Sequence, residues 1–362
     1  IEITPAQLAL DPCSASAVIT DVNTGEVRAL VTYPSYDNNK FSGTVDAEYY
    51  NKLNNDQSLP LFNNATQAQK APGSTFKPII AVAALEEGVI GLNDTVNCTG
   101  IYKEITPALR CWIYPGQHGP LDVVHGIQNS CNVFFSEMGH RLSMDENGNY
   151  SPELGIEKIR KYASMFGLDE TSGIEIAERE PQMTTEKPEA SSIGQGKNSY
   201  SNIQLSRYIT AVANKGTVFK LSLLDKMTDS QGNLLKDFTP EVRSTIDVKD
   251  STWNAVHTGM RRVISDGSAR KIFSDLEVDI AGKTGTAAEI KNGHRVNHAF
   301  FVSFAPCQNP EIAVTVNIPY GYSSSNAAAA AKNIYRYYYG YTDLNYILNN
   351  SALNSSNVEI GD

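Results

Sequence analysis

The chain has 362 residues, of which 41% are apolar and 19% are charged, and its formal net charge at pH 7 is −10. This composition is sufficient for a large hydrophobic core with ordinary helix and strand content. The negative net charge argues against a nucleic-acid-binding protein. The sequence has no apolar run long enough to cross a membrane as a helix, which requires about 20 residues.

The N-terminal region predicts a β-hairpin, and a buried helix is predicted farther along the chain. Residues 16–21 and 26–32 alternate apolar and polar side chains on either side of a turn at 23–25. The almost wholly apolar segment 78–85 predicts a helix that is buried on all sides. The Pro-Gly pair at 72–73 allows the chain to enter this helix through a sharp turn.

The middle of the chain is predicted to be mostly helical. Residues 120–142 fit one helix or two short ones, and the apolar spacing of 154–167 and 202–214 predicts two more. Residues 218–239 predict a surface hairpin that turns at 230–233.

The C-terminal part predicts further strands between two helices. The helices are predicted over 253–263 and 327–339, and the aromatic residues 335–339 are expected to pack on the sheet. The strands are predicted at 278–290, 298–305 and 311–318. Residues 341–362 are rich in Asn and Ser and predict a weakly ordered tail.

These elements predict an α+β fold in which both chain ends contribute to one antiparallel sheet. Helices cover the sheet, and an all-helical subdomain is inserted into it. We expect one domain over residues 1–340, with its parts placed as follows: sheet about 14–40 and 253–340, helical subdomain about 60–215, and surface hairpin about 217–240.

Ser74 and Lys77 form an S-x-x-K motif at the entrance to the predicted buried helix. Residues three apart share one face of a helix, so the hydroxyl and the amine can touch. The hydroxyl would lie at the positive end of the helix dipole, and a serine beside a base is the general arrangement for acyl transfer. The same spacing recurs at Ser268 and Lys271, which we interpret as a solvated copy without function.

Two further motifs are each ambiguous when taken alone. The S-x-N segment 130–132 is also consistent with a polar helix boundary, and S-x-N recurs at 324–326 and 355–357. The K-T-G-T segment 283–286 lies in a predicted strand. It is also consistent with an edge strand that carries a protective lysine and a glycine bulge.

Together, in this order, the three motifs resemble those of the transpeptidase domain of penicillin-binding proteins. The resemblance covers roughly residues 15–340 and implies the serine β-lactamase/transpeptidase-like fold. Further stretches, among them 25–30, 192–196 and 298–302, resemble the class B, monofunctional branch. The stretch 137–178 is more similar to elongation-type enzymes than to septal ones.

The motif residues supply the parts that acyl transfer needs. We expect Ser74 to be the nucleophile and Lys77 to be the base that accepts its proton. Ser130 would relay that proton to the departing nitrogen, assisted by the positive charge of Lys283.

The substrate-binding residues are expected beside these four. Asn132 offers an amide that can bind both a donor and an acceptor of a peptide backbone. Thr284 and Thr286 supply hydroxyls for a substrate carboxylate, and Gly285 leaves the strand edge open for a peptide. The resemblance also implies that the backbone N–H groups of Ser74 and Thr286 form the oxyanion hole.

The resemblance implies the reaction as well. Similar proteins expel the last D-alanine from the D-Ala-D-Ala end of a peptidoglycan stem peptide, hold the remainder as an acyl-serine, and transfer it to an amine of another stem. β-Lactams mimic that end and acylate the serine. The implied partners are therefore stem peptides, β-lactams and a cell-wall synthesis complex. We expect a membrane-anchored protein on the extracytoplasmic face of a bacterial membrane, of which this chain is a soluble fragment.

Two other classes of function remain open from the residues alone. A serine β-lactamase or a penicillin-sensing receptor domain has the same motifs, but the E-x-x-L-N element of class A lactamases is absent between Glu153 and Lys197. The Y-G-N element of class D lactamases is absent too. A non-catalytic cell-wall binding module would not need Ser74, Lys77 and Lys283 together.

The five cysteines are an odd number. Cys98 and Cys111 flank a short loop and either form a disulfide or remain thiols. We expect Cys131 to be a small packed residue and Cys13 and Cys307 to be free thiols. No two cysteines or histidines stand at the spacing typical of metal ligands, so we expect no metal site and no cofactor.

Three other features have two interpretations each. Trp112, Tyr114 and His118 either line the cleft or pack within a loop. The Gly-Gln-Gly segment 194–196 either supports the cleft rim or is a plain turn. His298, beside the K-T-G strand, is expected to be structural.

Overall fold

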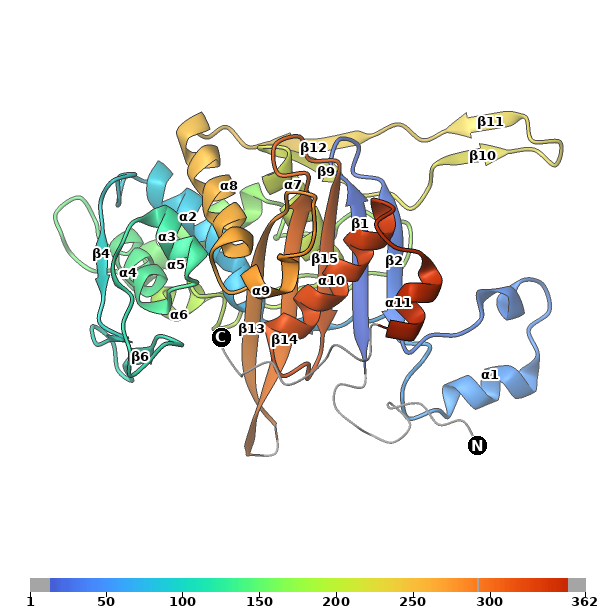
Figure 1. The fold of residues 1–362 in the computed structure, drawn as a ribbon, viewed down its shortest axis with the longest axis horizontal. Helices are drawn as coiled ribbons and strands as arrows, with labels where there is room; N and C mark the ends of the chain where they lie inside the picture. Colours follow the sequence, from blue (N-terminus) through green and yellow to red (C-terminus); the bar gives the residue numbers. More distant parts are fainter. Residues whose placement is uncertain (1–13, 292, 351–362) are drawn as a thin grey trace.

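The computed structural model describes residues 14–291 and 293–350 of the chain. Its centre is a five-stranded antiparallel sheet with the strand order β13-β14-β15-β1-β2 (Figure 1). The bounds of these strands are β1 (Ala15–Asp21), β2 (Val27–Tyr33), β13 (Ala281–Lys291), β14 (His294–Ala305) and β15 (Ile312–Ile318).

Both chain ends contribute to this sheet, as the sequence predicts. β1 pairs with β15 in a register that places Val18 opposite Thr315, and β1 and β2 form the predicted N-terminal hairpin. Burial alternates along β1, whereas β15 is buried at every position but the last. The reason is that β15 packs against helices on both faces, α7 and α10. β13 is an edge strand, so one of its two hydrogen-bonding edges is not occupied by the sheet.

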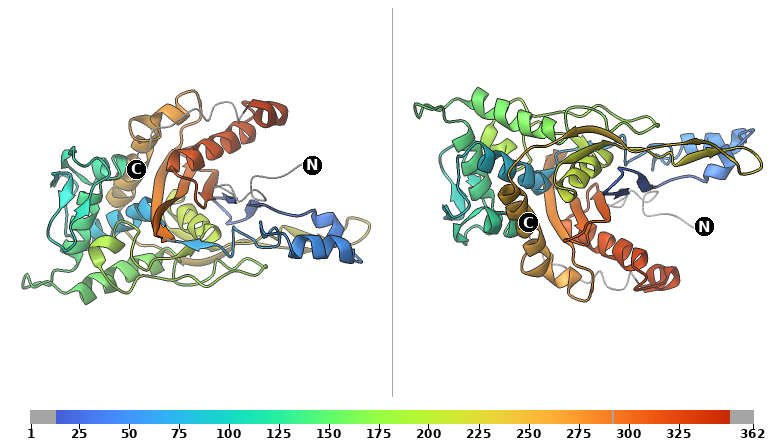
Figure 2. Two further views of the ribbon diagram at one scale, coloured as in Figure 1. Left: turned by 90° about the horizontal axis from the view of Figure 1, so that it is seen from below. Right: turned by 90° about the horizontal axis from the view of Figure 1, so that it is seen from above.

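Helices cover both faces of the sheet. Figure 2 shows α7 (Asn202–Ala213) and α10 (Ser324–Tyr338) on opposite sides. Buried polar pairs fix each helix: the hydroxyls of Thr20 and Thr210 lie 2.6 Å apart on the α7 side, and those of Ser303 and Tyr335 lie 2.9 Å apart on the α10 side. α8 (Asp250–Ser265) and the short α9 (Arg270–Phe273) pack beside α10 and β13.

The insertion between β2 and α7 is mostly helical. Its helices are α1 (Ala47–Asn54), α2 (Lys77–Glu86), α3 (Val123–Gln128), α4 (Asn132–Leu142), α5 (Pro152–Met165) and α6 (Pro188–Ser191), with the 3₁₀ helices η1 (Asn38–Phe41) and η2 (Gly73–Phe76). Residues 120–142 thus form two short helices, one of the two predicted arrangements.

The prediction of an all-helical insertion is wrong for residues 96–121. This segment forms two short strand pairs, β4 (Val96–Cys98) with β7 (Gly119–Leu121) and β5 (Ile101–Tyr102) with β6 (Leu109–Arg110). Its prolines and glycines interrupt helical hydrogen bonding, so short paired strands replace a helix there. A further pair, β3 (Gln69–Lys70) with β8 (Tyr200–Ser201), lies beside the entrance to α2.

The predicted surface hairpin is present in part. β10 (Lys226–Thr228) and β11 (Leu234–Asp237) pair around the expected turn and project from the body of the molecule (Figure 1). However, β9 (Thr217–Lys220) pairs with β12 (Glu241–Thr245) instead of belonging to the same simple hairpin. The reason is that Val218 and Phe219 are buried against the domain, which the exposed β10 and β11 are not.

The predicted weakly ordered tail contains the helix α11 (Leu344–Asn350). Asp343 accepts a hydrogen bond from the backbone N–H of Tyr346, and the guanidinium of Arg336 lies 5.7 Å from the Tyr346 ring centre. The sequence interpretation missed this N-terminal cap. Residues 351–362 of the predicted tail lie outside the described residues. In the described part of the chain, no helix has both the length and the apolarity to cross a membrane.

Candidate functional site

Ser74 lies in the 3₁₀ turn η2, directly before the buried helix α2. Residues 77–85 of α2 are all buried, as their apolar sequence predicts. Pro78 has no N–H with which to bond the carbonyl of Ser74, so the turn closes through the N–H of Lys77 instead. Ser74 is half-buried at this entrance, and Gly73 before it donates a hydrogen bond to the carbonyl of Gly194 at 3.0 Å. The segment 194–196 therefore supports the turn that carries Ser74.

The side-chain nitrogen of Lys77 joins the S-x-x-K motif to the S-x-N motif. The Lys77 side chain is fully buried, and its Nζ donates to the carbonyl oxygen of Ser130 at 2.7 Å and to Oδ1 of Asn132 at 2.8 Å. The Ser130 hydroxyl lies 3.3 Å from the same nitrogen, and the Phe135 ring centre lies 5.5 Å from it. A buried ammonium needs such partners, because its desolvation is otherwise costly.

The S-x-N segment is a tight turn between α3 and α4. The N–H of Cys131 bonds the carbonyl of Gly126, and the N–H of Ser130 bonds that of Ile127, which is the Schellman pattern that ends many helices. Ser130 has φ +51°, the left-handed conformation in which glycine is usual. A serine kept at such a position is a sign that its side chain has a function. Asn132 then begins α4, and its Nδ2 donates to the carbonyl of Arg110 at 3.1 Å.

The K-T-G-T segment of β13 packs on η2, the turn that carries Ser74. A Cβ atom added at Gly285 would lie 2.7 Å from Cγ2 of Thr75 and 3.1 Å from the carbonyl oxygen of Pro72. A Cβ atom added at Gly73 would lie 2.7 Å from the carbonyl oxygen of Thr286. These two glycines allow the backbones of Ser74 and Thr286 to come close together.

Side chains alternate along β13, so Lys283 and Gly285 share one face, and Thr284 and Thr286 share the other. Lys283 is fully buried, and its Nζ donates to the carbonyl of Thr284 at 3.0 Å. The Thr284 hydroxyl lies 3.1 Å from that of Ser268. In contrast, the buried hydroxyl oxygen of Thr286 has no hydrogen-bond partner among the described residues.

The three motifs therefore converge around Ser74, although they are far apart in the sequence. Ser268, which we interpret from the sequence as part of a solvated copy of the S-x-x-K motif, is exposed, as is Lys271, and its hydroxyl lies beside that of Thr284. Nothing in the sequence around Ser268 indicates its contact with Thr284. Trp112 also lies at the site, since its Nε1 donates to the carbonyl of Asn129, next to Ser130, at 2.9 Å.

His298 has the structural role that the sequence predicts. Its Nε2 lies 2.8 Å from Oε2 of Glu289, which also pairs with Lys70 at 2.6 Å. The hydrogen bond from Lys70, followed by that from His298, holds the pKa of Glu289 below its ordinary value. The Lys70–Glu289 pair connects β13 to β3, the strand that precedes η2, the turn of Ser74.

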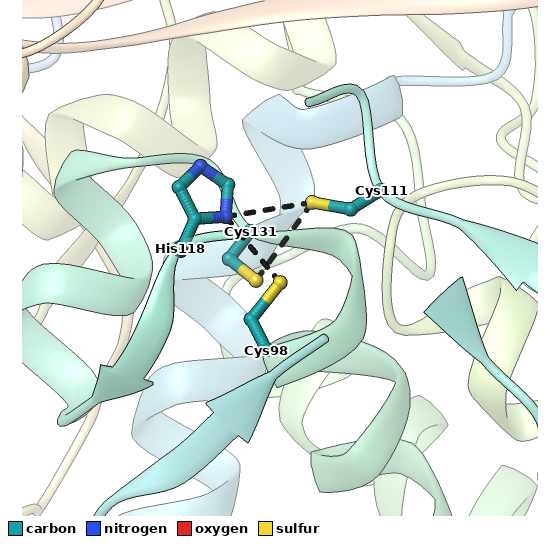
Figure 3. Close-up of side chains that lie close together, drawn as sticks. All are labelled: Cys98, Cys111, His118 and Cys131. Carbon is teal, nitrogen blue, oxygen red and sulfur yellow. Dashed lines mark hydrogen bonds between the residues drawn. The ribbon is translucent and has the colours of Figure 1, made fainter. Parts of the chain in front are cut away.

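A second group of reactive side chains lies beside the S-x-N turn. Figure 3 shows Cys98, Cys111, His118 and Cys131 with their sulfur atoms and imidazole facing one another. Cys98 and Cys111 are free thiols and not the disulfide that their spacing allowed. We expect no metal site from the sequence spacing, and this stays a prediction. The structure nevertheless brings four residues with metal-binding atoms together here. Cys307 is also a free thiol, as predicted, and Cys13 lies outside the described residues.

The chain belongs to the family described as the penicillin binding protein transpeptidase domain, which it matches over residues 15–336. It is similar to the peptidoglycan D,D-transpeptidase MrdA of Haemophilus influenzae, with 30% identity over 91% of this chain and 53% of that protein. MrdA of Escherichia coli K12 is 31% identical over 85% of this chain and 51% of that protein. These relatives confirm the predicted resemblance to class B proteins of the elongation type. The chain spans about half the length of the curated relatives that it matches.

Solved structures agree with the predicted fold. Pseudomonas aeruginosa PBP2 in complex with WCK 5153 has a TM-score of 0.77 and 29% identity, and covers 92% of this chain and 75% of its own. A chain of a peptidoglycan synthase complex has a TM-score of 0.80 and 25% identity, over 91% of this chain and 56% of its own. The serine β-lactamase/transpeptidase-like α+β fold is thereby confirmed.

The left-handed turn at Ser130 generates a stability prediction. Ser130→Gly and Ser130→Ala both remove the hydroxyl, but only glycine adopts φ +51° without strain. We expect Ser130→Gly to be more stable than Ser130→Ala by about 0.5–1 kcal/mol in urea denaturation.

Ser136, in the middle of α4, provides the matched control. There the order should reverse, with the alanine variant more stable than the glycine variant by about 1 kcal/mol. Equal stability of the two Ser130 variants would show that the turn carries no strain.

Proposed function

We propose that this chain is the catalytic domain of a D,D-transpeptidase that cross-links peptidoglycan stem peptides through an acyl-serine intermediate. One observation carries the proposal: the fully buried side-chain nitrogen of Lys77, one turn after Ser74, bonds both Ser130 and Asn132. This contact gathers a nucleophile, a base and a proton relay at one place, which is the set that acyl transfer requires.

In the proposed acylation, Ser74 Oγ attacks the carbonyl carbon of the penultimate D-alanine and gives its proton to Lys77. For this step Lys77 must be neutral. The carbonyl oxygen of Ser130 and Oδ1 of Asn132 accept hydrogen bonds from the Lys77 nitrogen and orient it. The C–N bond then breaks, and Ser130, 3.3 Å from Lys77 Nζ, passes the proton to the departing D-alanine nitrogen.

The negative charge that develops on the carbonyl oxygen needs preorganised donors. We assign this role to the backbone N–H groups of Ser74 and Thr286. The close approach of Gly73 to the Thr286 carbonyl supports this assignment, because it places the two backbones side by side. Loss of one such donor typically lowers kcat about 10²–10³-fold.

The substrate would lie along the edge of β13 as an added strand. Thr286 offers a buried hydroxyl without a partner in the described structure, which fits a terminal substrate carboxylate. Thr284 would act on the same carboxylate, Lys283 would contribute its positive charge from the opposite face of β13, and Asn132 would bind the substrate backbone. In the second half of the reaction, an amine from another stem peptide attacks the acyl-serine, and a new amide bond replaces the ester.

The likeness to relatives supports the proposed partners and location. The P. aeruginosa relative has been solved in complex with WCK 5153, and another relative belongs to a peptidoglycan synthase complex. By the same inference, β-lactams acylate Ser74, and the whole protein works in a cell-wall synthesis complex at the extracytoplasmic face of the membrane.

Mass spectrometry after brief exposure to a penicillin tests this proposal. We expect one long-lived adduct on Ser74, none in Ser74→Ala, and an unchanged adduct in the control Ser274→Ala, whose residue is exposed after α9. A D-Ala-D-Ala pentapeptide should also release D-alanine.

Each other outcome contradicts the proposal in a different way. Penicillin hydrolysis without an accumulated adduct would indicate a β-lactamase. An adduct without D-alanine release would indicate a penicillin-sensing domain. No reaction with either compound would indicate a binding module.

The Thr286 hydroxyl generates a second functional prediction. Thr286→Val keeps the side-chain shape and removes no hydrogen bond within the described structure. We therefore expect the free energy of unfolding to stay equal or to rise slightly. The kcat/KM for the pentapeptide should fall about 10–100-fold through the lost bond to a carboxylate.

Thr284→Val provides a contrast, because it breaks the bond to Ser268 and should lower the free energy of unfolding by about 1 kcal/mol. Unchanged kcat/KM in Thr286→Val would remove Thr286 from the substrate site.

A further inference from the structure

β13 carries a charged pair beyond the K-T-G-T segment, on the part of the strand that leads to its hairpin with β14 (Figure 1). Lys70 of β3 contributes the ammonium, whose nitrogen lies 2.6 Å from Oε2 of Glu289 on β13. The two side chains are 25% and 42% exposed, so a ligand can reach both of them. No step of the proposed reaction uses this pair.

The neighbours of Glu289 hold its carboxylate in a defined position. His298 is buried, and its Nε2 lies 2.8 Å from Oε2 of Glu289. The Nδ1 of His298 accepts a hydrogen bond from the backbone N–H of Tyr320 at 3.2 Å. Because Nδ1 is an acceptor, Nε2 carries the proton and donates it to Glu289. Lys70 and His298 thus both contact Oε2, and among the described residues no hydrogen bond reaches Oε1.

The loop that supports His298 is strained. Tyr320 has φ +58° and Tyr322 has φ +61°, which is the left-handed region that side chains other than glycine rarely adopt. The ring centre of Tyr320 lies 5.0 Å from that of His298 and 5.7 Å from Nζ of Lys70. An exposed ion pair by itself adds little stability, whereas strained residues concentrate at functional sites. The strained loop and the fixed carboxylate together indicate a site for a ligand.

The direction of the substrate along β13 follows from the proposed function. The leaving D-alanine directs its carboxylate to the hydroxyls of Thr284 and Thr286, and the N–H of Thr286 faces the scissile carbonyl. The rest of the stem peptide therefore runs from Thr286 toward residues 287–289, antiparallel to β13. The D-alanine that forms the acyl group lies opposite Thr286, and the stem residue before it lies opposite Ala287.

This register directs one substrate side chain toward the charged pair. Residues opposite each other in an antiparallel pair share a face, so an L-configured residue opposite Ala287 shares the face of Ala287 and Glu289. His298, the β14 partner of Ala287, lies on the same face and contacts Glu289. A residue opposite Ala287 is diagonal to Glu289, at a separation of about 7–8 Å, which a long side chain can span.

The charges of the pair determine which side chain fits. Cross-linking by the proposed reaction requires that stem peptides carry an amine, and the donor stem carries it as well. An ammonium that approaches Oε1 of Glu289 also comes close to Lys70, which repels it unless the ligand brings a negative charge of its own. A side chain that ends in both an ammonium and a carboxylate satisfies the pair at two points.

We propose that Lys70 and Glu289 bind the side chain of the stem residue before the two D-alanines, and that this side chain ends in an ammonium and a carboxylate. Glu289 accepts the ammonium, and Lys70 pairs with the carboxylate. The inference rests on the proposed function and adds the substrate class, which is a stem with a diamino dicarboxylic acid at this position. Both residues bind substrate away from the reacting atoms, so they determine specificity and take no part in the proton transfers.

Three pentapeptides that end in D-Ala-D-Ala and differ only in their third residue test this subsite. Diaminopimelate supplies both charged groups, lysine supplies only the ammonium, and norleucine supplies neither. Since the pair is partly exposed, we expect kcat/KM for D-alanine release to be about tenfold higher with diaminopimelate than with norleucine. The lysine peptide should lie close to norleucine, and a lysine peptide equal to diaminopimelate would overturn the role of Lys70.

Variants of the pair separate specificity from structure. Glu289→Gln and Lys70→Met should each remove most of the preference for diaminopimelate and leave kcat/KM for the norleucine peptide unchanged. The matched control is Glu241→Gln, which removes the carboxylate of an exposed pair with Lys220 on β9 and β12 and should keep the preference. An equal fall for all three peptides in the Glu289 and Lys70 variants would show a structural role alone and would overturn the subsite.

Binding measurements keep the test independent of the proposed activity. Calorimetric titration of Ser74→Ala, which prevents turnover, should give a Kd for the diaminopimelate peptide about tenfold below that for the norleucine peptide. This preference in binding without D-alanine release from the unchanged chain would contradict only the proposed function. Equal kcat/KM and equal Kd for the three peptides would overturn the subsite, whether or not the variants of the pair fold.

Discussion

The hydrogen bonds of the buried Lys77 side chain connect the helix that follows Ser74 with the turn of Ser130 and Asn132. The proposed chemistry depends on this connection. An amine enclosed in an apolar helix has a large desolvation cost, and this cost falls only where oxygen acceptors surround it. Its acceptors here are the carbonyl of Ser130 and the side chain of Asn132. Since α2 is buried on all sides, the α3–α4 turn must dock at its entrance for the amine to be satisfied.

That requirement explains several local features that are unfavourable by themselves. Ser130 occupies a left-handed position at which glycine would be less strained. Gly73 and Gly285 lack side chains where a Cβ atom would collide with neighbouring backbone or with Thr75. The two glycines allow the backbone of β13 to approach the turn of Ser74, and the turn at Ser130 places its hydroxyl beside Lys77. Each feature has a cost in conformational free energy that the surrounding fold must offset.

The sequence was most informative in two kinds of segment: those with a clear periodicity of apolar side chains, and those with residues that acyl transfer requires. The apolar segment after Lys77 predicted a buried helix, and the alternation at 16–32 predicted the first hairpin; both are present. All three motifs could be recognised, because acyl transfer restricts which residues can stand in them. Their contacts could not be derived from spacing, since Lys77 and Asn132 meet only through the tertiary fold.

The features that the sequence did not predict depend on contacts between distant residues, or on segments too short to show a periodic pattern. Cys98, Cys111, His118 and Cys131 come from four segments with no regular spacing, so their proximity is not visible in the sequence. Ser268 reaches Thr284 only because α8, which precedes Ser268, packs beside β13. The short strands of 96–121 and the helix α11 contain too few residues to show a clear periodicity of apolar side chains. The sequence therefore predicts a helical insertion in place of these strands and a weakly ordered tail in place of α11.

The rate at which penicillin acylates Ser74 in a Lys77→Met variant tests the central claim most directly. Methionine has a similar length and no charge, so the variant can fold, which near-ultraviolet circular dichroism verifies. If Lys77 is the base and the link between the motifs, the acylation rate constant falls about 10²–10⁴-fold. A folded variant that acylates within threefold of the unchanged chain would contradict this account.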